Sequence, residues 1–192
     1  LGNLLKEKEL RPVYSEFSNP NGKRSRIILP DSSVVFLNAA SKLRYAKSFN
    51  GDTREVFLEG EAFFEIVHDE EKPFIVQSGS VNTTVLGTSF NVKAFKGDNR
   101  IAVTVQSGKV GVSIKREGSK KFLQYLFPDQ QLDINTITGD YSFNTLDVAN
   151  STSWKDNRIV FYNNSLEEIG RTLERWYNLK VVLTHPENSS YT

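Results

Sequence analysis

The stretch from Arg54 to Val67, REVFLEGEAFFEIV, constrains the fold more than any other part of the chain. Its apolar residues recur with a period of two, which is typical of a β-strand that turns one face toward a core. Phe57 and Phe63 fall on the other face, so both faces carry large apolar side chains. Glu59 and Gly60 interrupt the run as turn residues, and we expect two strands joined there in a hairpin. Such a hairpin must be covered by further sheet.

Similar short β-rich runs occur on both sides of this stretch. They are separated by turn residues, mostly glycine, at a spacing of roughly 8–12 residues, which predicts an all-β sandwich, barrel or stacked solenoid. A short internal repeat, VQSGSV at 76–81 and VQSGKV at 105–110, favours stacked antiparallel hairpins with corresponding turns, in a solenoid-like or sandwich-like arrangement. The runs are Arg26–Leu29, Val34–Asn38, Leu43–Tyr45, Phe74–Gln77, Val81–Leu86, Phe90–Phe95, Ile101–Gln106, Lys109–Lys115, Phe122–Phe127, Gln131–Ile134 and Tyr141–Phe143.

The pattern changes near Trp154, after which helical spacing appears. Ser165 followed by Glu168 is a capping-box signature for the start of a helix. Apolar residues at helical spacing then predict a helix over Leu166–Tyr177, with Asn178 as its C-terminal cap.

Two further β-rich runs flank this helix. Arg158–Tyr162 precedes it and Lys180–Thr184 follows it, so the three elements predict a partial β-α-β module, which we expect to be truncated. Gly170 within the helix is less favourable than alanine by about 1 kcal/mol, so we expect another segment to pack closely there. The predicted parts are a linker (1–25), an all-β domain (26–148) and the start of a C-terminal β-α-β module (149–192).

The composition narrows the possible functions. A net charge of +1 provides no field that attracts a polyanion, so we expect no nucleic-acid partner. The absence of cysteine excludes disulfides, thiolate metal sites and a cysteine nucleophile. No run approaches the roughly 20 apolar residues that span a bilayer. Because the sequence has no methionine, we expect it to be part of a longer protein.

Three glutamates near the central stretch are the nearest approach to a catalytic constellation. Glycosidases use two carboxylates about 5–9 Å apart, and Glu59, Glu61 and Glu65 offer such pairs on a sheet face. Exposed glutamates beside a turn are more often the solvated edge of a sheet. The interpretation as an enzyme is therefore the weaker one, and we expect no catalytic residue.

The sequence also gives little sign of a metal or cofactor. With only His68 and His185 present, a site with several histidines is impossible. Asp69–Glu71 offers oxygen ligands for calcium but lacks the spacing of a calcium loop. There is no phosphate-binding loop, nucleophile elbow or zinc spacing, and we expect neither cofactor nor metal.

Several segments of the chain, taken in order, form a characteristic set: LPDSSVVFLNA (29–39), REVFLEGEAFFEI (54–66), PFIV (73–76), LGTSFNVKAF (86–95), SGKV (107–110) and PDQQL (128–132). Together they resemble the FecR family, the transmembrane anti-sigma factors and sigma regulators of Gram-negative bacteria. Ser32 stands where the family's first turn usually has glycine, which implies strain if that turn needs a positive φ. Phe36 stands where a tryptophan is common.

This resemblance implies a role in signal relay. A TonB-dependent transducer in the outer membrane would contact the periplasmic portion of the protein. The message would then pass through one inner-membrane helix to an extracytoplasmic-function sigma factor. This chain would be the periplasmic portion of the membrane-anchored protein, with the sigma-binding domain and the membrane helix before Leu1. Trp154–Leu183 looks like the start of the C-terminal module of Bacteroidetes members, which is similar to the small signalling domain of secretins and TonB-dependent receptors.

We expect the transducer to bind the C-terminal module. An exposed edge strand has unpaired backbone groups ready for strand addition, and aromatic residues crowd this part of the chain. Two hypotheses from other classes stay open: a β-solenoid carbohydrate-binding or glycosidase domain, and a purely structural envelope protein. The predicted partner-binding residues are Arg158, Ile159, Val160, Phe161 and Tyr162 on the strand, and Arg171, Glu174 and Arg175 on the helix.

Overall fold

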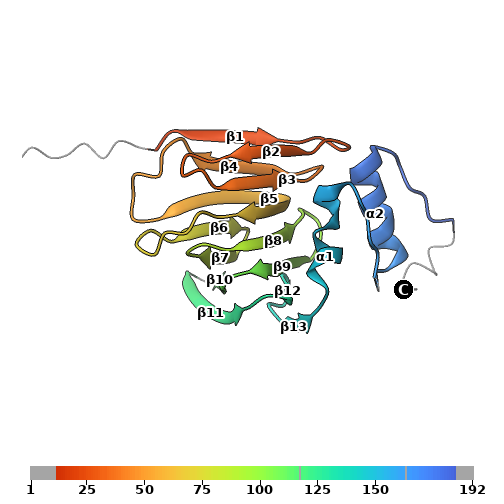
Figure 1. The fold of residues 1–192 in the computed structure, drawn as a ribbon. Helices are drawn as coiled ribbons and strands as arrows, with labels where there is room; N and C mark the ends of the chain where they lie inside the picture. Colours follow the sequence, from red (N-terminus) through yellow and green to blue (C-terminus); the bar gives the residue numbers. More distant parts are fainter. Residues whose placement is uncertain (1–11, 117, 163, 185–192) are drawn as a thin grey trace, which may run out of the picture.

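The computed structural model describes residues 12–116, 118–162 and 164–184. They form thirteen strands followed by short helical elements and a longer helix (Figure 1). The strands are β1 (Tyr14–Ser18), β2 (Ser25–Ile28), β3 (Val34–Leu37), β4 (Lys42–Ala46), β5 (Arg54–Glu65), β6 (Phe74–Ser78), β7 (Val81–Val85), β8 (Ser89–Ala94), β9 (Arg100–Ser107), β10 (Val110–Arg116), β11 (Ser119–Leu126), β12 (Gln130–Asn135) and β13 (Tyr141–Thr145). The helices are α1 (Val148–Ser151), the 3-10 helix η1 (Ser153–Asp156) and α2 (Leu166–Tyr177).

The strands belong to one curled sheet of mixed direction that folds into two layers. Layer A consists of β1, β4, β5, β6, β7, β10 and β11 in that order. Layer B consists of β2, β3, β5, β8, β9, β12 and β13. Among the described strands, only β5 and β6 run parallel to each other. The predicted mainly β fold is confirmed, and β5 is the strand that the two layers share.

The course of β5 shows that the predicted hairpin is wrong. Arg54–Glu65 is one unbroken strand of 12 residues. At Gly60, where φ is +102°, the strand leaves β4 and β6 of layer A and joins β3 and β8 of layer B. A Cβ at Gly60 would lie 2.3 Å from the Ser41 Oγ atom, so both the backbone conformation and the space require glycine. Gly60 moves the strand from one layer to the other, and the alternation of core residues continues through it.

After β5, successive hairpins alternate between the layers. β6–β7 and β10–β11 extend layer A, and β8–β9 and β12–β13 extend layer B. β10 then pairs with β7 and β12 with β9, which gives the stack of strands seen in Figure 1. The short repeat does not mark corresponding turns, contrary to expectation. Ser78-Gly79 closes the β6–β7 hairpin, whereas Ser107-Gly108 connects β9 of layer B with β10 of layer A.

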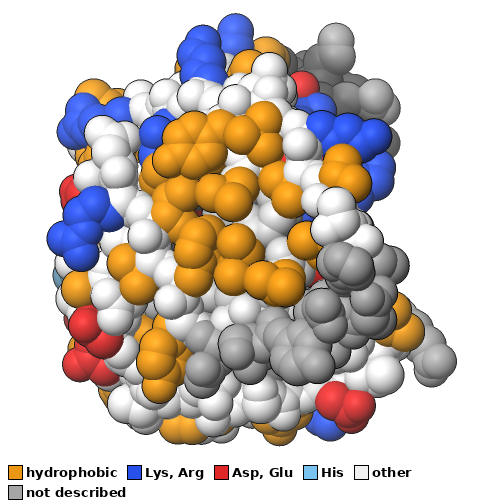
Figure 2. Space-filling view, turned by 90° about the vertical axis from the view of Figure 1, so that its right-hand side faces the viewer, with side chains coloured by type: hydrophobic (Ala, Val, Ile, Leu, Met, Phe, Trp, Pro, Cys, Tyr) orange, Lys and Arg blue, Asp and Glu red, His pale blue; other side chains and the backbone are white. Residues whose placement is uncertain are grey.

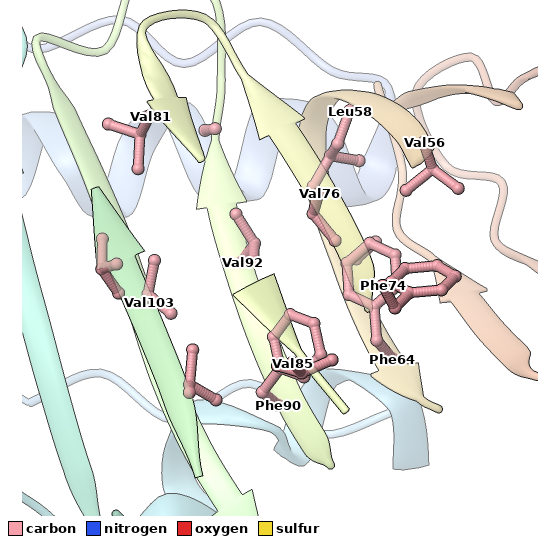
Figure 3. Close-up of a cluster of buried hydrophobic side chains, with 14 of the residues drawn as sticks. Val56, Leu58, Phe64, Phe74, Val76, Val81, Val85, Phe90, Val92 and Val103 are labelled. Carbon is pink, nitrogen blue, oxygen red and sulfur yellow. The ribbon is translucent and has the colours of Figure 1, made fainter. Parts of the chain in front are cut away.

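The main core lies between the two layers (Figure 3). Phe64 and Phe90 from layer B stack with their ring centroids 5.1 Å apart, and Phe74 from layer A lies 6.3 Å from Phe64. Val56 and Val103 are equally inaccessible to solvent. Side chains from both layers therefore fill one continuous apolar interior.

The β domain begins earlier than the sequence predicts. β1 lies in the stretch expected to be a linker, and it pairs with β4 along its whole length, from Tyr14 opposite Ala46 to Ser18 opposite Lys42. β2 begins at Ser25. Residues 1–11 of the predicted linker lie outside the described residues.

The predicted helix forms as expected. α2 spans Leu166–Tyr177, and its capping box is complete: the Ser165 hydroxyl accepts the Glu168 N–H at 3.3 Å, and the Glu168 carboxylate accepts the Ser165 N–H at 3.0 Å. Asn178 ends the helix with a φ of +52°. Sequence signals within one helical turn were sufficient here because both caps depend on local contacts.

The strands expected beside α2 do not form within the described residues. Arg158–Tyr162 and Lys180–Thr184 lie in no strand. A β-rich run becomes a strand only when a neighbour pairs with its backbone, and these runs contact side chains instead. Val181 packs on α2, where its Cγ1 atom would lie 3.3 Å from a Cβ placed on Gly170. This contact confirms the close packing that the buried glycine predicted.

Candidate docking surface at the C-terminal segment

The C-terminal segment, defined here as the described residues between 148 and 184, packs on the side of layer B that faces away from the main core. A second apolar cluster joins the two, and its buried members are Phe63, Trp154 and Trp176. Phe36 and Ile159 pack against them. Phe63 follows directly on Ala62 of the main core, so this half of β5 is covered on both faces.

A chain of buried hydrogen bonds connects the same segment to β5. The Trp154 indole N–H donates to the Asn91 side-chain oxygen at 3.2 Å. The amide groups of Asn91 and Asn38 in turn donate to the two carboxylate oxygens of Glu61, at 3.0 and 2.9 Å. Glu61 is 8% exposed. A buried carboxylate with both oxygens engaged has a structural role, because the amide donors compensate for its lost hydration.

This arrangement removes the basis of the carbohydrate hypothesis at these glutamates. Glu61 is buried and occupied, so it cannot meet a sugar. Glu59 and Glu65 are exposed, but they lie six positions apart on β5, which corresponds to about 20 Å of extended strand. That distance is well beyond the 5–9 Å that glycosidase carboxylates need.

On the other side of the segment, α2 is held by a carboxylate from the loop between β8 and β9. Asp98 accepts two hydrogen bonds from the Arg175 guanidinium, at 3.1 and 2.9 Å, in the bidentate geometry that such pairs favour. Arg171 lies 3.4 Å from the same carboxylate, and the Arg175 guanidinium is stacked 3.8 Å from the centre of the Phe95 ring. The Arg175 and Asp98 side chains are each 16% exposed, so solvent screens this pair only partly.

The loop between β1 and β2 contacts the C-terminal end of α2. The Gly22 N–H donates to the Arg175 carbonyl at 2.7 Å, which satisfies one of the free carbonyls in the last turn. The Arg24 guanidinium lies 4.1 Å from the centre of the Trp176 ring and donates to the Trp154 carbonyl at 3.2 Å. These contacts join the helix to a part of the chain about 150 residues earlier.

The predicted residues on the helix face turn toward their own chain. Arg171 and Arg175 bind Asp98, and the Glu174 carboxylate accepts the Val181 N–H at 2.9 Å. In this conformation, the three side chains stabilise the packing of α2. Their role in binding a partner stays a prediction.

The predicted strand residues lie apart from that contact. Arg158 exchanges hydrogen bonds with Ser153, and Ile159 packs on the second apolar cluster. Val160, Phe161 and Tyr162 are exposed by 37%, 38% and 80%. The structure thus leaves three consecutive apolar or aromatic side chains at the surface, in a run whose backbone joins no sheet among the described residues.

Further large apolar side chains are exposed on α2 and after it. Figure 2 views the side of the molecule that carries α2 and shows apolar side chains gathered there. The exposed large apolar residues of the C-terminal segment are Val160, Phe161, Tyr162, Leu166, Tyr177, Leu179 and Val182.

Sequence reasoning missed the residues that hold the segment in place. Asp98 follows Gly97 in what reads as an ordinary turn, and Gly22 and Arg24 lie in the predicted linker. No local pattern relates them to α2, because the contacts span 73 residues or more.

The described residues provide no grouping of three or more histidine, aspartate or glutamate side chains that would suit a metal ion. Asp69, considered above for calcium, accepts the N–H groups of Glu71 and Lys72, both at 3.0 Å, and so stabilises its own turn. Among the residues that the structure describes, no helix has the length and apolar character needed to cross a membrane.

Comparison with known proteins identifies the family. Residues 16–111 match the family described as FecR protein, and residues 158–192 match the one described as FecR, C-terminal. The chain belongs to the FecR family. The FecR match covers β2 to β9, the end of β1 and the start of β10. The C-terminal match begins at Arg158 and includes α2.

Two solved structures are similar to this FecR-family chain over most of its length. Both are crystal structures of a candidate anti-sigma factor from Parabacteroides distasonis ATCC 8503. The match to the 2.50 Å structure has 37% sequence identity and a TM-score of 0.80, and it covers 86% of this chain and 76% of the other. The match to the 1.65 Å structure has 38% sequence identity and a TM-score of 0.79, and it covers 85% of this chain and 75% of the other. No curated protein matches the chain.

Proposed function

We propose that this chain is the periplasmic sensor region of a transmembrane anti-sigma factor. It would relay a signal from a TonB-dependent outer-membrane transducer to an extracytoplasmic-function sigma factor. The observation that carries the proposal is the order of the two family matches, FecR and then FecR, C-terminal, in a chain 37–38% identical to candidate anti-sigma factors. The sigma factor would be bound by a separate cytoplasmic domain, and the chain described here would receive the signal.

The surface that we propose for the transducer's signalling domain is centred on Val160, Phe161 and Tyr162. These side chains are exposed, and aromatic residues contribute strongly to protein interfaces. In the described part of the chain, the Val160 N–H has no acceptor, whereas the Tyr162 N–H donates to the Asn164 side-chain oxygen at 3.0 Å, a bond that the partner's strand would replace. An extended segment of the partner would pair with this run by strand addition.

The test compares two substitutions at one position. Val160→Pro removes the N–H that strand addition needs, whereas Val160→Ala removes most of the side chain and keeps the N–H. Isothermal titration would measure binding of the signalling domain of the TonB-dependent receptor encoded nearest to this protein. We expect one-to-one binding by the wild type, little change in Val160→Ala and at least about a tenfold loss in Val160→Pro.

Circular dichroism of each variant would show that the β domain stays folded. Equal affinities of Val160→Pro and the wild type would contradict strand addition at this run. No binding by the folded wild type would contradict the choice of partner.

A further inference from the structure

A cleft of about 190 Å³ lies where the β domain meets η1. Arg24, Arg26 and Phe36 line it from the side of β2 and β3, and Trp154, Lys155 and Asn157 line it from η1 and the residue that follows. Since a water molecule takes up about 30 Å³ of liquid, the cleft has room for an ion of several heavy atoms.

The charges around this cleft are predominantly positive. Arg24, Arg26 and Lys155 contribute three cations, and none of the residues that line the cleft carries a carboxylate. Lys155 is paired with Asp156 at 3.0 Å, but that carboxylate is 64% exposed and lies outside the lining. Within the described residues, Arg26 and Arg24 have no acidic side chain within ion-pairing distance. The cleft therefore holds an uncompensated positive charge.

Arg24 is held in place for such a role. Its guanidinium stacks on Trp176 and donates one hydrogen bond to the Trp154 carbonyl, which fixes the plane of the group. An arginine has five N–H donors, so the others stay available for a ligand. Holding a guanidinium by stacking reduces the entropy lost when it binds an oxyanion in bidentate geometry.

Two of the residues that line the cleft are aromatic, and both, Phe36 and Trp154, belong to or pack on the second apolar cluster. Low-dielectric walls strengthen the field of nearby charges. Asn157, which also lines the cleft, carries a neutral side chain that can donate and accept hydrogen bonds.

We infer that this cleft binds a small oxyanion of the phosphate or carboxylate class, held between Arg24, Arg26 and Lys155. The site spans the β domain and η1, so a bound anion would connect the two. The inference does not depend on the proposed relay and requires no partner protein.

Binding at this site can be detected by the intrinsic tryptophan fluorescence of the chain. It has two tryptophans, of which Trp154 lines the cleft and Trp176 stacks on Arg24. The experiment titrates the chain with inorganic phosphate and, separately, with succinate. Ionic strength is held constant with sodium chloride, and calorimetry of the same mixtures serves as a second measurement.

Arg26→Gln is the test variant, because Arg26 is exposed and its loss leaves the core intact. Lys121→Gln makes the same change of charge on β11, at the far end of layer A. We expect saturable binding that Arg26→Gln weakens by at least about tenfold, as expected for one charge-assisted hydrogen bond, and that Lys121→Gln leaves unchanged.

A higher affinity for phosphate would assign the site to free phosphate or a phosphorylated compound. A higher affinity for succinate would assign it to carboxylates. No saturation by either anion in either measurement would overturn the inference, as would equal weakening in the two variants.

Discussion

The β domain and the C-terminal segment lie against each other but are stabilised in different ways. The β domain buries a continuous apolar core between its layers, and each fully buried side chain there contributes about 1.5–3 kcal/mol. The C-terminal segment buries a smaller apolar set, Trp154, Trp176 and Val148, and depends also on polar contacts such as that of Asp98 with Arg175. Each polar contact contributes only about 0.5–3 kcal/mol. We therefore expect the β domain to unfold as a unit, and the segment to detach at a lower free energy than global unfolding.

The largest effect is expected from a change in the main core. Phe64→Ala removes a ring that is fully buried and packed on Phe90 and Phe74, and it should lower the free energy of unfolding by about 3–5 kcal/mol. Phe143→Ala, on the exposed strand β13, is the control, since that ring is 44% exposed. Urea unfolding followed by circular dichroism would measure both. A similar loss in the two variants would show that the interior between the layers is not the main source of stability.

A smaller effect is expected where the two regions meet. Glu61→Gln replaces one carboxylate oxygen by an amide N–H₂, so that a donor faces the amide donor of Asn38 or Asn91. Leaving one buried donor unsatisfied should lower the free energy of unfolding by about 1–3 kcal/mol.

Glu59→Gln is the matched control, because Glu59 is exposed on the same strand and should change stability very little. Unfolding of both variants would be followed by tryptophan fluorescence, because Trp154 hydrogen-bonds to Asn91 and its surroundings change when the contact is lost. If Glu61→Gln were as stable as Glu59→Gln, the buried chain of hydrogen bonds would not contribute to the packing of the C-terminal segment on the β domain.

The comparison also shows which features a sequence reveals. Alternation located the strands from Arg26 to Phe143, and the capping box fixed the start of α2, because both depend on residues close together in the chain. The crossing of β5 between layers at Gly60 was missed, since a glycine that ends a strand and one that redirects it look alike in sequence.

Contacts between distant residues were missed for a related reason. Arg54, at the start of β5, is 2% exposed and donates to the Asp31 carboxylate and the carbonyls of Lys72 and Val67, and nothing near it in the sequence indicates these acceptors. Arg171 and Arg175, predicted to bind a partner, instead bind Asp98 of their own chain. A polar pattern shows that a partner is needed, but it does not show whether that partner lies in another protein or elsewhere in the same chain.

The smallest effect is expected at the contact between α2 and the β8–β9 loop. Asp98→Ala removes the acceptor shared by Arg171 and Arg175, in a pair that is mostly but not fully buried, and it should weaken the docking of α2 by about 1–2 kcal/mol. Hydrogen exchange measured by mass spectrometry would detect this as roughly tenfold faster exchange in Leu166–Tyr177. Exchange in β5 and β8 should stay unchanged, because the core between the layers is untouched. Asp52→Ala removes an exposed carboxylate in a loop of the β domain and is the matched control. Faster exchange throughout the β domain in Asp98→Ala would contradict the separation of the two regions, since it would mean that α2 and the stacked strands open together as one cooperative unit.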